Sequence, residues 1–539
     1  MPRMTTPTFI LELPIQDGDD VSRFLKPKFS FGTQVYNATL HTALGRLQRL
    51  RESQAWRDAC TLTDKAERNK ELTRLRKEAG LTEYGLVTVA NDHRNAAKRF
   101  VPVTTPGAKG KRKPDGECIL GAHVAQTLGK RVWRAVERYM FGKGGRPRFK
   151  SQRRQLSSLE GQCANATIIW KPSAQAVVWN KRPMKVLVPE TPYVEEALRD
   201  PLDPQKPRRI KYCRIVRRNI RGHERYFLQL AMEGRAPVRH VYAPTSERVG
   251  IDPGPRKITV YSHAGVFTTP VATVEDHQVV IRRIQRGMDR SKRATNPDNY
   301  NEDGTCKTGH LQWTFSKNYE RLRAALAEIY RRLAQTRKRD HGTLVNLVLS
   351  LGGRVAVEKN SYKSYQRNFG KSTNQYGVGS LVTRLANKAA SAGSKFVELN
   401  AYRLCLSRYE HVNGTYCKKP LGQRWTRVGD CVVQRDAYSA FLAAFADDKG
   451  HDRSLLRKEW TRAEPLLRAA GLCRDFNPAT DGDLSKSTRE PVFAVHFRQS
   501  GMQLEAFRKS GNGRPSTRCR KHRSNRRSRL GSKGIPSLQ

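Results

Sequence analysis

The stretch Arg248-Val-Gly-Ile-Asp-Pro-Gly-Pro255 decides how the fold of this chain is predicted. An apolar run begins at Val249 and ends on a carboxylate, Asp252, and the Pro-Gly-Pro sequence that follows it indicates a tight turn. A second apolar strand is expected directly after the turn, from Lys257 to Ser262. The sequence therefore predicts a β-hairpin that holds Asp252 at the end of its first strand.

Two further carboxylates occupy comparable positions downstream. Glu358 ends the apolar run Arg354-Val-Ala-Val357, and Asp436 opens an apolar-periodic segment, 437–445. Mg²⁺ prefers oxygen ligands, so three such carboxylates could hold two Mg²⁺ ions. Two-ion sites clamp the attacking and leaving oxygens of a phosphoryl displacement, which is the chemistry of cutting a nucleic-acid backbone.

Each of these carboxylates also has a plain structural alternative. Asp-Pro-Gly is a common turn sequence when it stands alone. Glu358 could pair with Lys359 or Arg354, and Asp436 could cap the helix that follows it. The order and context of the three carboxylates favour the metal site over these alternatives.

The charge of the chain predicts a polyanionic partner. Its 101 Lys and Arg residues against 49 Asp and Glu residues give a net charge of +52 over 539 residues. So large an excess destabilises the free compact protein through self-repulsion, and every phosphate contact relieves that repulsion and releases counterions. We therefore expect RNA or DNA to be bound.

Composition also bounds the class of protein. The length predicts about three or four domains, and a hydrophobic content of 37% supports real cores. No apolar stretch approaches the roughly 20 residues of a membrane span, and residues 1–10 lack the apolar core of a secretory signal. Ten cysteines without any Cys-x-x-Cys pair indicate reduced thiols. These features predict a soluble, cytoplasmic protein without disulfides.

The N-terminal half divides by its periodicity. A strand is expected at Thr8 to Leu13, helices over 31–139 with a Gly-, Pro- and Lys-rich loop at 106–116, and short strands between Ala166 and Met232 that suggest a small barrel. A long helix is expected from about Ser316 to Arg339. Its apolar stripe, which should pack on the core, comprises Leu322, Leu326, Ile329 and Leu333.

A Gly-rich basic turn, Gly142-Lys-Gly-Gly-Arg-Pro-Arg-Phe-Lys150, follows the helical region. Its glycines allow close backbone approach and its cations supply charge, so we expect it to contact phosphate; an exposed linker is the alternative. The nucleic-acid-binding residues predicted from sequence are Lys143, Arg146, Arg148, Lys150, Arg290, Arg293 and Arg435.

Four segments together resemble a known family. They are Arg248 to Gly254, Met288 to Tyr300 with Asp303-Gly304 and Trp313, Glu358-Lys-Asn-Ser-Tyr-Lys-Ser-Tyr365, and Gln434-Arg-Asp-Ala-Tyr-Ser-Ala-Phe-Leu442. In order and spacing they are similar to the successive RuvC motifs of TnpB proteins, which are transposon-encoded RNA-guided nucleases, and of the compact type V CRISPR effectors related to them. The resemblance covers residues 248–470 well.

The resemblance implies a multidomain α/β protein with an RNase H-like (RuvC) nuclease domain and an N-terminal β-barrel (wedge) domain that carries a helical recognition insertion. Asp252, Glu358 and Asp436 would be the catalytic carboxylates that hold Mg²⁺. The expected ranges are 1–30 and 151–247 for the wedge barrel, 31–150 for the helical insertion, 248–404 and 432–475 for the nuclease domain, 405–431 for a zinc-finger-like insertion that binds target nucleic acid, and 476–539 for a basic, disordered tail.

The chain departs from the family between Glu358 and Asp436, where these proteins carry paired cysteines that bind zinc. The remaining candidates are Cys405, His411, Cys417 and Cys431. A structural zinc site needs four N or S ligands at close spacing, and these four could converge only through unusual loops. We therefore expect a degenerate finger without zinc.

The expected activity follows from the resemblance together with the three carboxylates. The chain is predicted to be an RNA-guided DNA-targeting effector of antiviral defence, with guide RNA, a double-stranded DNA target bearing a PAM-like motif, and the displaced single strand as partners, associated with the nucleoid when target-bound. An effector that binds and silences without efficient cleavage is the alternative, and a general basic RNA-binding protein is a weaker third. A CRISPR and a transposon origin of the guide remain equally open.

Overall fold

The computed structural model describes residues 7–96, 100–101, 117–151, 154–237, 246–420, 422–447, 450–482, 484 and 494–497. The chain forms two compact units: Met1–Ala243 with His277–Arg332, and Pro244–Asp276 with Leu333–Gln539. The predicted loop at 106–116 lies outside the described residues, as does most of the predicted basic tail. In the described part of the chain, no helix is long and apolar enough to cross a membrane.

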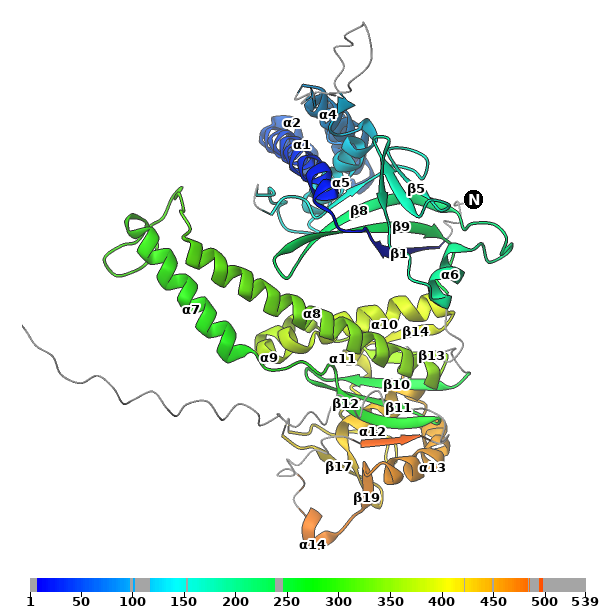
Figure 1. The fold of residues 1–539 in the computed structure, drawn as a ribbon. Coiled ribbons are helices and arrows are strands. Elements are labelled where there is room, and N and C mark those ends of the chain that lie inside the picture. The colour runs from blue at the N-terminus through cyan, green and yellow to red at the C-terminus, as the bar shows by residue number, and fades with distance from the viewer. Residues whose placement is uncertain are drawn as a thin grey trace, which may run out of the picture. The chain divides into compact units, whose positions relative to one another are not determined.

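The first unit contains a helical bundle, a four-stranded sheet, a three-stranded sheet and a short two-stranded pair formed by β2 (Phe100–Val101) and β3 (Glu117–Cys118) (Figure 1). Its helices are α1 (Asp19–Glu52), α2 (Gln54–Thr61), α3 (Lys65–Glu78), α4 (Glu83–Ala96), α5 (Ala122–Met140), α6 (Pro192–Leu198) and α7 (Gln278–Thr295), with a 3₁₀ turn at Pro297–Asn299 and the start of α8 (Lys317–Leu351). Its other strands are β1 (Thr8–Pro14), β4 (Ser158–Glu160), β5 (Ile168–Lys171), β6 (Ala176–Trp179), β7 (Arg182–Lys185), β8 (Ile210–Ile220) and β9 (His223–Glu233).

The predicted strands of this unit are largely confirmed, but the described strands do not form a closed barrel. They form one sheet in the order β1-β9-β8-β4 and another in the order β5-β6-β7, linked by a bridge between Ile15 and Val186. The predicted boundary at residue 30 falls inside α1, because the helix starts at Asp19 and its buried side chains run without a break from Val21 to Leu50. One continuous apolar stripe keeps the segment a single helix.

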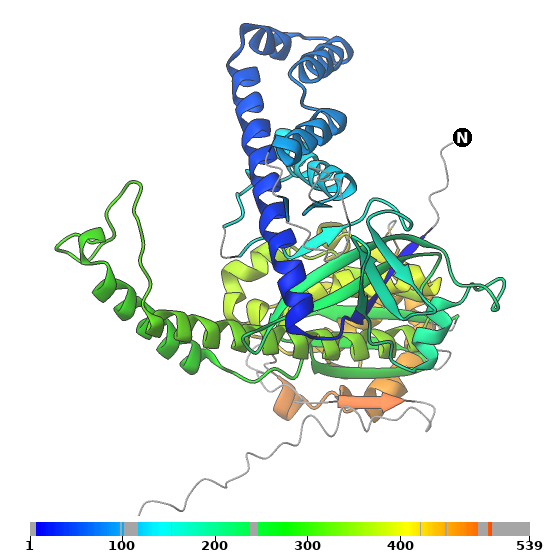
Figure 2. The same cartoon turned by 45° about the horizontal axis from the view of Figure 1, so that its top comes forward.

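The second unit is built on a six-stranded mixed sheet, which is seen edge-on in the lower half of Figure 1 and again, turned, in Figure 2. The strands that form it are β10 (Arg248–Pro253), β11 (Lys257–Ser262), β12 (Gly265–Pro270), β13 (Arg354–Glu358), β14 (Lys395–Leu399) and β20 (Ala494–Phe497). Their order is β14-β13-β10-β11-β12-β20; β10, β13 and β14 run parallel, whereas β10 to β12 form an antiparallel meander. The hairpin predicted at Asp252 is therefore present as β10 and β11.

Helices cover both faces of this sheet. In Figure 1, α10 (Val378–Ala392) and the end of α8 lie on one face, and α12 (Arg435–Phe445) and α13 (Arg453–Ala469) lie on the other. The remaining elements are α9 (Tyr362–Tyr376), α11 (Ala401–Leu404), β15 (Tyr409–Glu410), β16 (Thr415–Tyr416), β17 (Trp425–Val428), β18 (Cys431–Gln434), β19 (Cys473–Asp475) and α14 (Pro478–Asp481). Helix α14 and strand β20 lie in the range predicted to be a disordered tail, so that prediction is wrong for these residues.

Helix α8 is longer than predicted, and a different part of it packs on the core. Its buried side chains on the sheet side are Leu344, Val345, Val348, Leu349 and Leu351. The side chains of the predicted stripe, which includes Leu322, are only half-buried. Leu322 lies against α7, since a Cβ added to Gly287 of that helix would be 3.0 Å from Leu322 Cδ1. This part of α8 groups with the first unit rather than with the nuclease range predicted from sequence.

Side-chain alternation on β10 decides what each face of the sheet carries. Val249 and Ile251 join the core under α8 and α10, so Gly250 and Asp252 face α12. An added Cβ on Gly250 would overlap the carbonyl O of Ala440 and the backbone N of Ala444 in α12. Only glycine allows this approach of helix to strand.

We expect Gly250→Ala to lower the free energy of unfolding of the second unit by about 1–3 kcal/mol or more, because the methyl group would overlap helix backbone rather than a movable side chain. Thermal and denaturant unfolding measure this. Gly370→Ala in α9 is the matched control, since nothing lies within 4 Å of its added Cβ. An unfolding midpoint that Gly250→Ala leaves unchanged would contradict the close contact.

Candidate active site and basic surfaces

The first two carboxylates lie side by side at the carboxyl ends of two neighbouring strands in the interior of the sheet. Strands β10 and β13 are parallel, with Ile251 opposite Val357, so Asp252 and Glu358 follow in register at the carboxyl ends of adjacent strands. Both are half-buried, and the pleat turns both toward α12. The predicted strand ends therefore bring these two side chains to one place.

The third carboxylate comes from the first turn of α12. Asp436 lies one turn before Ala440, the residue that Gly250 approaches, so the contact between strand and helix fixes Asp436 close to Asp252. The helix is capped by Gln434, whose Oε1 accepts from the Ala437 N–H at 2.7 Å while its Nε2 donates to Asp436 Oδ2 at 3.1 Å. The capping alternative for Asp436 is therefore wrong, because Gln434 performs that role.

The ion-pair alternative for Glu358 is not found among the described residues. The Arg354 guanidinium donates to the carbonyls of Ala444 and Ala446 at 2.9 and 2.7 Å, at the carboxyl end of α12. Lys359 lies 3.9 Å from Glu398 instead. Arg354 thus helps to hold the other end of the helix that carries Asp436.

Burial and mutual repulsion dominate the electrostatics of the site. Burial raises the pKa of Asp252 well above its usual range, the negative charges of Asp436 and Glu358 raise it further, and Arg435 and Arg424 oppose the shift. Burial also raises the pKa of Glu358, which the Asn360 side chain partly offsets. The two nearby arginines therefore do not offset the effects of burial and of the two neighbouring carboxylates on Asp252.

A tyrosine that the sequence analysis quoted without a role lies against this cluster. Tyr365 Oη donates to the Pro253 carbonyl at 3.4 Å, and burial together with the charges of Asp252 and Glu358 raises its pKa. It follows Glu358 by seven residues, near the start of α9. Only its place in the motif could have identified it, because its spacing predicts a helix face and not a neighbour of Asp252.

The donor set fits Mg²⁺. A divalent cation would offset both the repulsion and the burial that raise the Asp252 pKa, and carboxylate oxygen is the ligand that Mg²⁺ prefers. Among the described residues, these three carboxylates do not place one oxygen each within 4.8 Å of one another. In this arrangement the three side chains would not all hold one ion.

The four predicted zinc candidates do not come together in the described structure. His411 is buried, its Nδ1 lies 2.8 Å from Tyr438 Oη, and its ring packs on Trp460. Cys417 is exposed, whereas Cys431 is buried. Burial lowers the pKa of His411 to about 4, with Arg457 and Arg453 adding to the shift, so this histidine is a neutral core residue.

The predicted basic residues have different surroundings. The four basic side chains of the turn after α5, which are Lys143, Arg146, Arg148 and Lys150, are all exposed. The Asn37 side chain exchanges two hydrogen bonds with the Lys150 backbone. Arg293 donates to Asp289 and to the Gly304 carbonyl, so it holds the connection between α7 and α8. Arg435 donates to the carbonyls of Pro420 and Gln423, which fixes the loop before the site.

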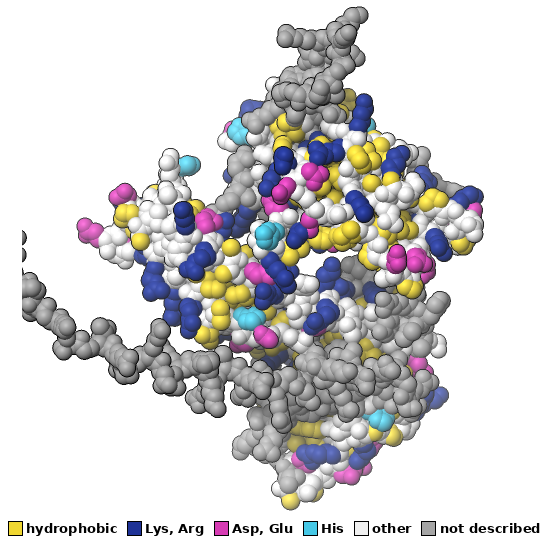
Figure 3. All heavy atoms as spheres, in the orientation of Figure 1, with side chains coloured by type: hydrophobic (Ala, Val, Ile, Leu, Met, Phe, Trp, Pro, Cys, Tyr) yellow, Lys and Arg dark blue, Asp and Glu magenta, His cyan; other side chains and the backbone are white. Residues whose placement is uncertain are grey.

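A basic surface that the sequence analysis found only in part lies on α7. Figure 3 shows Lys and Arg side chains gathered over α7. A hollow of about 540 Å³ lies on this helix. Its lining residues are Val279, Arg282, Arg283, Arg286, Asp289 and Arg290. Three arginines repeat every fourth residue and so share one helix face, which an array of phosphates could follow.

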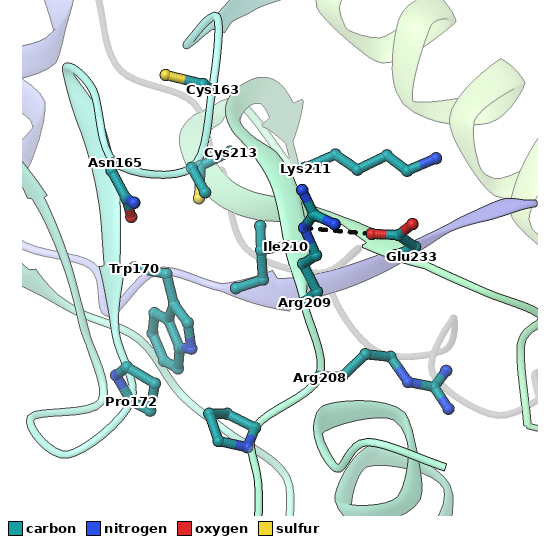
Figure 4. A pocket seen from close by; sticks show the side chains of 12 residues that line it. Cys163, Asn165, Trp170, Pro172, Arg208, Arg209, Ile210, Lys211, Cys213 and Glu233 are labelled. Carbon is teal, nitrogen blue, oxygen red and sulfur yellow. Dashed lines mark ion pairs between the residues drawn. The ribbon is translucent and has the colours of Figure 1, made fainter. Parts of the chain in front are cut away.

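A second hollow, of about 720 Å³, lies beside β8 in the first unit (Figure 4). The basic side chains that line it already contact other groups of the same unit. Arg209 pairs with Glu233 at 3.4 Å, and Lys211 Nζ donates to Thr8 Oγ1 at 2.6 Å. Arg208 donates to the Arg235 carbonyl at 3.0 Å. The α7 surface is therefore the stronger candidate for contact with nucleic acid.

Comparison with known proteins adds little to this geometry. No protein-family model matches the sequence, and no curated protein matches it. Among solved structures, the chain is similar to one described as "Cryo-EM structure of the Cas12f1-sgRNA-target DNA complex", with a TM-score of 0.34 and 11% identity over 81% of this chain and 98% of that one. Another, "Cryo-EM structure of CRISPR-Cas12f Ternary Complex", has a TM-score of 0.23 and 12% identity over 74% of each chain.

The neutral state of His411 predicts an acid-sensitive second unit. Because the folded-state pKa is about 4 and the unfolded value is about 6.5, the unfolded chain binds more protons between these values. The contribution of His411 is full above about pH 6.5 and is lost as the pH falls toward 4, by about 3 kcal/mol in total. Denaturant unfolding across this range should show a shallower decline for His411→Asn than for the unmodified protein.

The exposed His310 provides the substitution control, and His310→Gln should leave the free energy of unfolding at pH 7 unchanged. If His411→Asn gave the same pH slope as the unmodified protein, His411 would not be a buried neutral group. The slope that remains comes from other groups, including His263, His341 and His451, whose pKa values burial also lowers.

The α7 surface predicts a change in salt dependence. Replacing Arg286 and Arg290 with alanine should weaken binding of duplex DNA and reduce the slope of log K against log salt by about 0.9 for each phosphate that these side chains neutralise. The matched variant replaces Arg331 and Arg332, whose guanidinium groups bind Glu328, and removes the same charge. Equal slopes for the two double variants, measured by fluorescence anisotropy, would exclude α7 as a phosphate-contacting surface.

Proposed function

We propose that this protein is an RNA-guided DNA-targeting effector with a Mg²⁺-dependent, RuvC-type endonuclease site in an RNase H-like domain. One observation carries the proposal: Asp252, Glu358 and Asp436 converge where two adjacent parallel strands end against the first turn of α12. The meander of β10 to β12 followed by parallel β13 and β14 supports the domain assignment. The net charge of +52 supports a nucleic-acid substrate.

Mg²⁺ bound at these carboxylates would polarise the scissile phosphate and lower the pKa of an attacking water. Asp436 lies close enough to Asp252 for its charge to raise the pKa of that carboxyl, and Glu358 follows at the end of the neighbouring strand β13. Arg435 and Arg424 favour the charged form of Asp252 and so partly oppose the rise in its pKa that burial and the other two carboxylates cause. Gln434 orients the Asp436 carboxylate through its amide.

Guide RNA and target DNA are the partners in this proposal. The basic side chains of α7 and of the turn after α5 would follow the backbone of the heteroduplex, while base pairing with the guide would read the sequence. A PAM-like motif beside the target would be read in the groove by side chains of the N-terminal region.

A second candidate is an effector that binds its target without efficient cleavage. The observation that favours it is the dispersal of Cys405, His411, Cys417 and Cys431, since the family element that these residues replace lies beside the active site and helps to deliver the target strand. Guide-dependent binding would then survive without productive entry of the DNA strand.

The decisive experiment uses the protein purified with its co-expressed RNA. A target duplex library is incubated with it in Mg²⁺, and both retention and strand breaks are scored. Asp252→Asn, Glu358→Gln and Asp436→Asn should each reduce cleavage roughly 100- to 1,000-fold and leave retention unchanged, because each removes one carboxylate ligand of the Mg²⁺ that would stabilise the transition state. Retention without breaks in the unmodified protein would support the binding effector instead.

Glu398→Gln is the matched control. Glu398 lies on β14, the strand next to β13, and faces Lys359 at the surface. Its substitution removes one carboxylate from the same sheet without touching the site, so cleavage should stay at the unmodified rate. A loss there equal to that of Glu358→Gln would show that general destabilisation, and not ligand loss, explains the effect.

A further inference from the structure

Two cysteines and a glutamate form a compact cluster in the second unit, away from the three carboxylates. Cys431 Sγ, Cys473 Sγ and a Glu464 carboxylate oxygen all lie within 4.8 Å of one another. Among the residues that the structure describes, no other group of three His, Cys, Asp or Glu side chains comes so close together. The cluster combines two soft sulfur ligands with one oxygen ligand.

The three side chains come from three different elements. Cys431 begins β18, Cys473 begins β19, and Glu464 lies near the end of α13, which packs beside this small sheet. The intervals of 33 and 9 residues resemble no metal-binding motif. The cluster therefore exists only because β19 returns to pair with β18.

Strand register argues against a disulfide between these cysteines. Cys431 pairs with Asp475 and Cys473 pairs with Val433, so the two cysteines are diagonal neighbours across antiparallel strands. Diagonal Cα atoms lie about 7–8 Å apart, whereas a disulfide usually needs about 4.4–6.8 Å. One ion at about 2.3 Å from each sulfur bridges sulfurs up to about 4.6 Å apart, which suits a diagonal pair.

The surroundings provide both access and charge balance. The cysteines are 3% and 5% exposed, whereas the Glu464 side chain is 31% exposed and so forms the entrance. Arg468 donates to Glu464 Oε1 at 2.9 Å and also contacts Asp475 at 2.7 Å. It thus orients the carboxylate, as groups around metal ligands commonly do, and offsets the net negative charge of two thiolates, one carboxylate and a divalent ion.

We propose that Cys431, Cys473 and Glu464 bind a thiophilic divalent cation, Zn²⁺, with one coordination position left for water. Binding releases the two thiol protons to solvent. The ion joins β18, β19 and α13, and β18 ends in Gln434, the residue that caps α12 and bonds Asp436. With three protein ligands and one water, the site differs from the four-ligand structural finger considered from the sequence, and the two share only Cys431.

Cobalt substitution tests the site on the full chain with its co-purified RNA. After metal removal, Co²⁺ should give sulfur-to-cobalt charge-transfer bands that saturate at one equivalent, and Zn²⁺ should abolish them. Cys431→Ser and Cys473→Ser should lose the bands. Glu464→Gln, which keeps both thiols, should weaken Co²⁺ binding by at least roughly 10- to 100-fold. Co²⁺ bound only by carboxylates gives no such bands, so a failure of the proposed nuclease does not affect this readout.

Cys213→Ser and Cys417→Ser are the matched controls, one at a buried and one at an exposed cysteine outside the cluster, and both should keep the bands. Absence of bands in the unmodified protein, their survival in Cys473→Ser, or their loss in Cys417→Ser would overturn the proposal. A cystine between Cys431 and Cys473 in the metal-free protein would overturn it as well. If the serine variants fail to fold, as circular dichroism would show, the Glu464→Gln titration still decides.

Discussion

The contact between Gly250 on β10 and the backbone of α12 is the constraint on which the second unit depends. It brings a helix against a strand more closely than any side chain would allow, because an added Cβ would overlap the carbonyl O of Ala440. The helix meets this requirement with small residues on the facing turn and with side chains that are buried all round. Arg354 then binds the last carbonyls of α12, so the helix is held near its middle and at its end.

This constraint has an electrostatic consequence. Since Gly250 and Asp252 share one face of β10, and Asp436 lies one turn before Ala440 on α12, the contact that closes the core also brings two carboxylates together, with Glu358 beside them on β13. The cluster is unfavourable in the free protein, as the raised pKa values of Asp252 and Glu358 indicate. Sites that store such repulsion are typical of functional clusters, because a bound cation relieves it.

In the second unit, the residues that hold the carboxylate cluster in place are distinct from the carboxylates themselves. Gln434 connects the two: it ends β18, caps α12 and bonds Asp436. The Cys431, Glu464 and Cys473 cluster lies at the other end of β18 and would fix that strand through a bound ion. The separation of the four predicted zinc ligands is thus compatible with a rigid site, because sheet pairing and the proposed ligand set can hold the strand that leads into Asp436.

The hairpin at Asp252, the strand that ends on Glu358, the helix that opens at Asp436 and most strands of the first unit could be predicted from the sequence, because apolar periodicity and turn residues are local signals. The net charge also predicts a polyanionic partner. The folded structure was needed to show that Arg293 and Arg435 bind backbone carbonyls, that the end of α8 packs on the core, and that Cys431 meets Cys473 and Glu464. Each of these depends on contacts between residues that are far apart in the sequence, and such contacts cannot be predicted from residue spacing or composition.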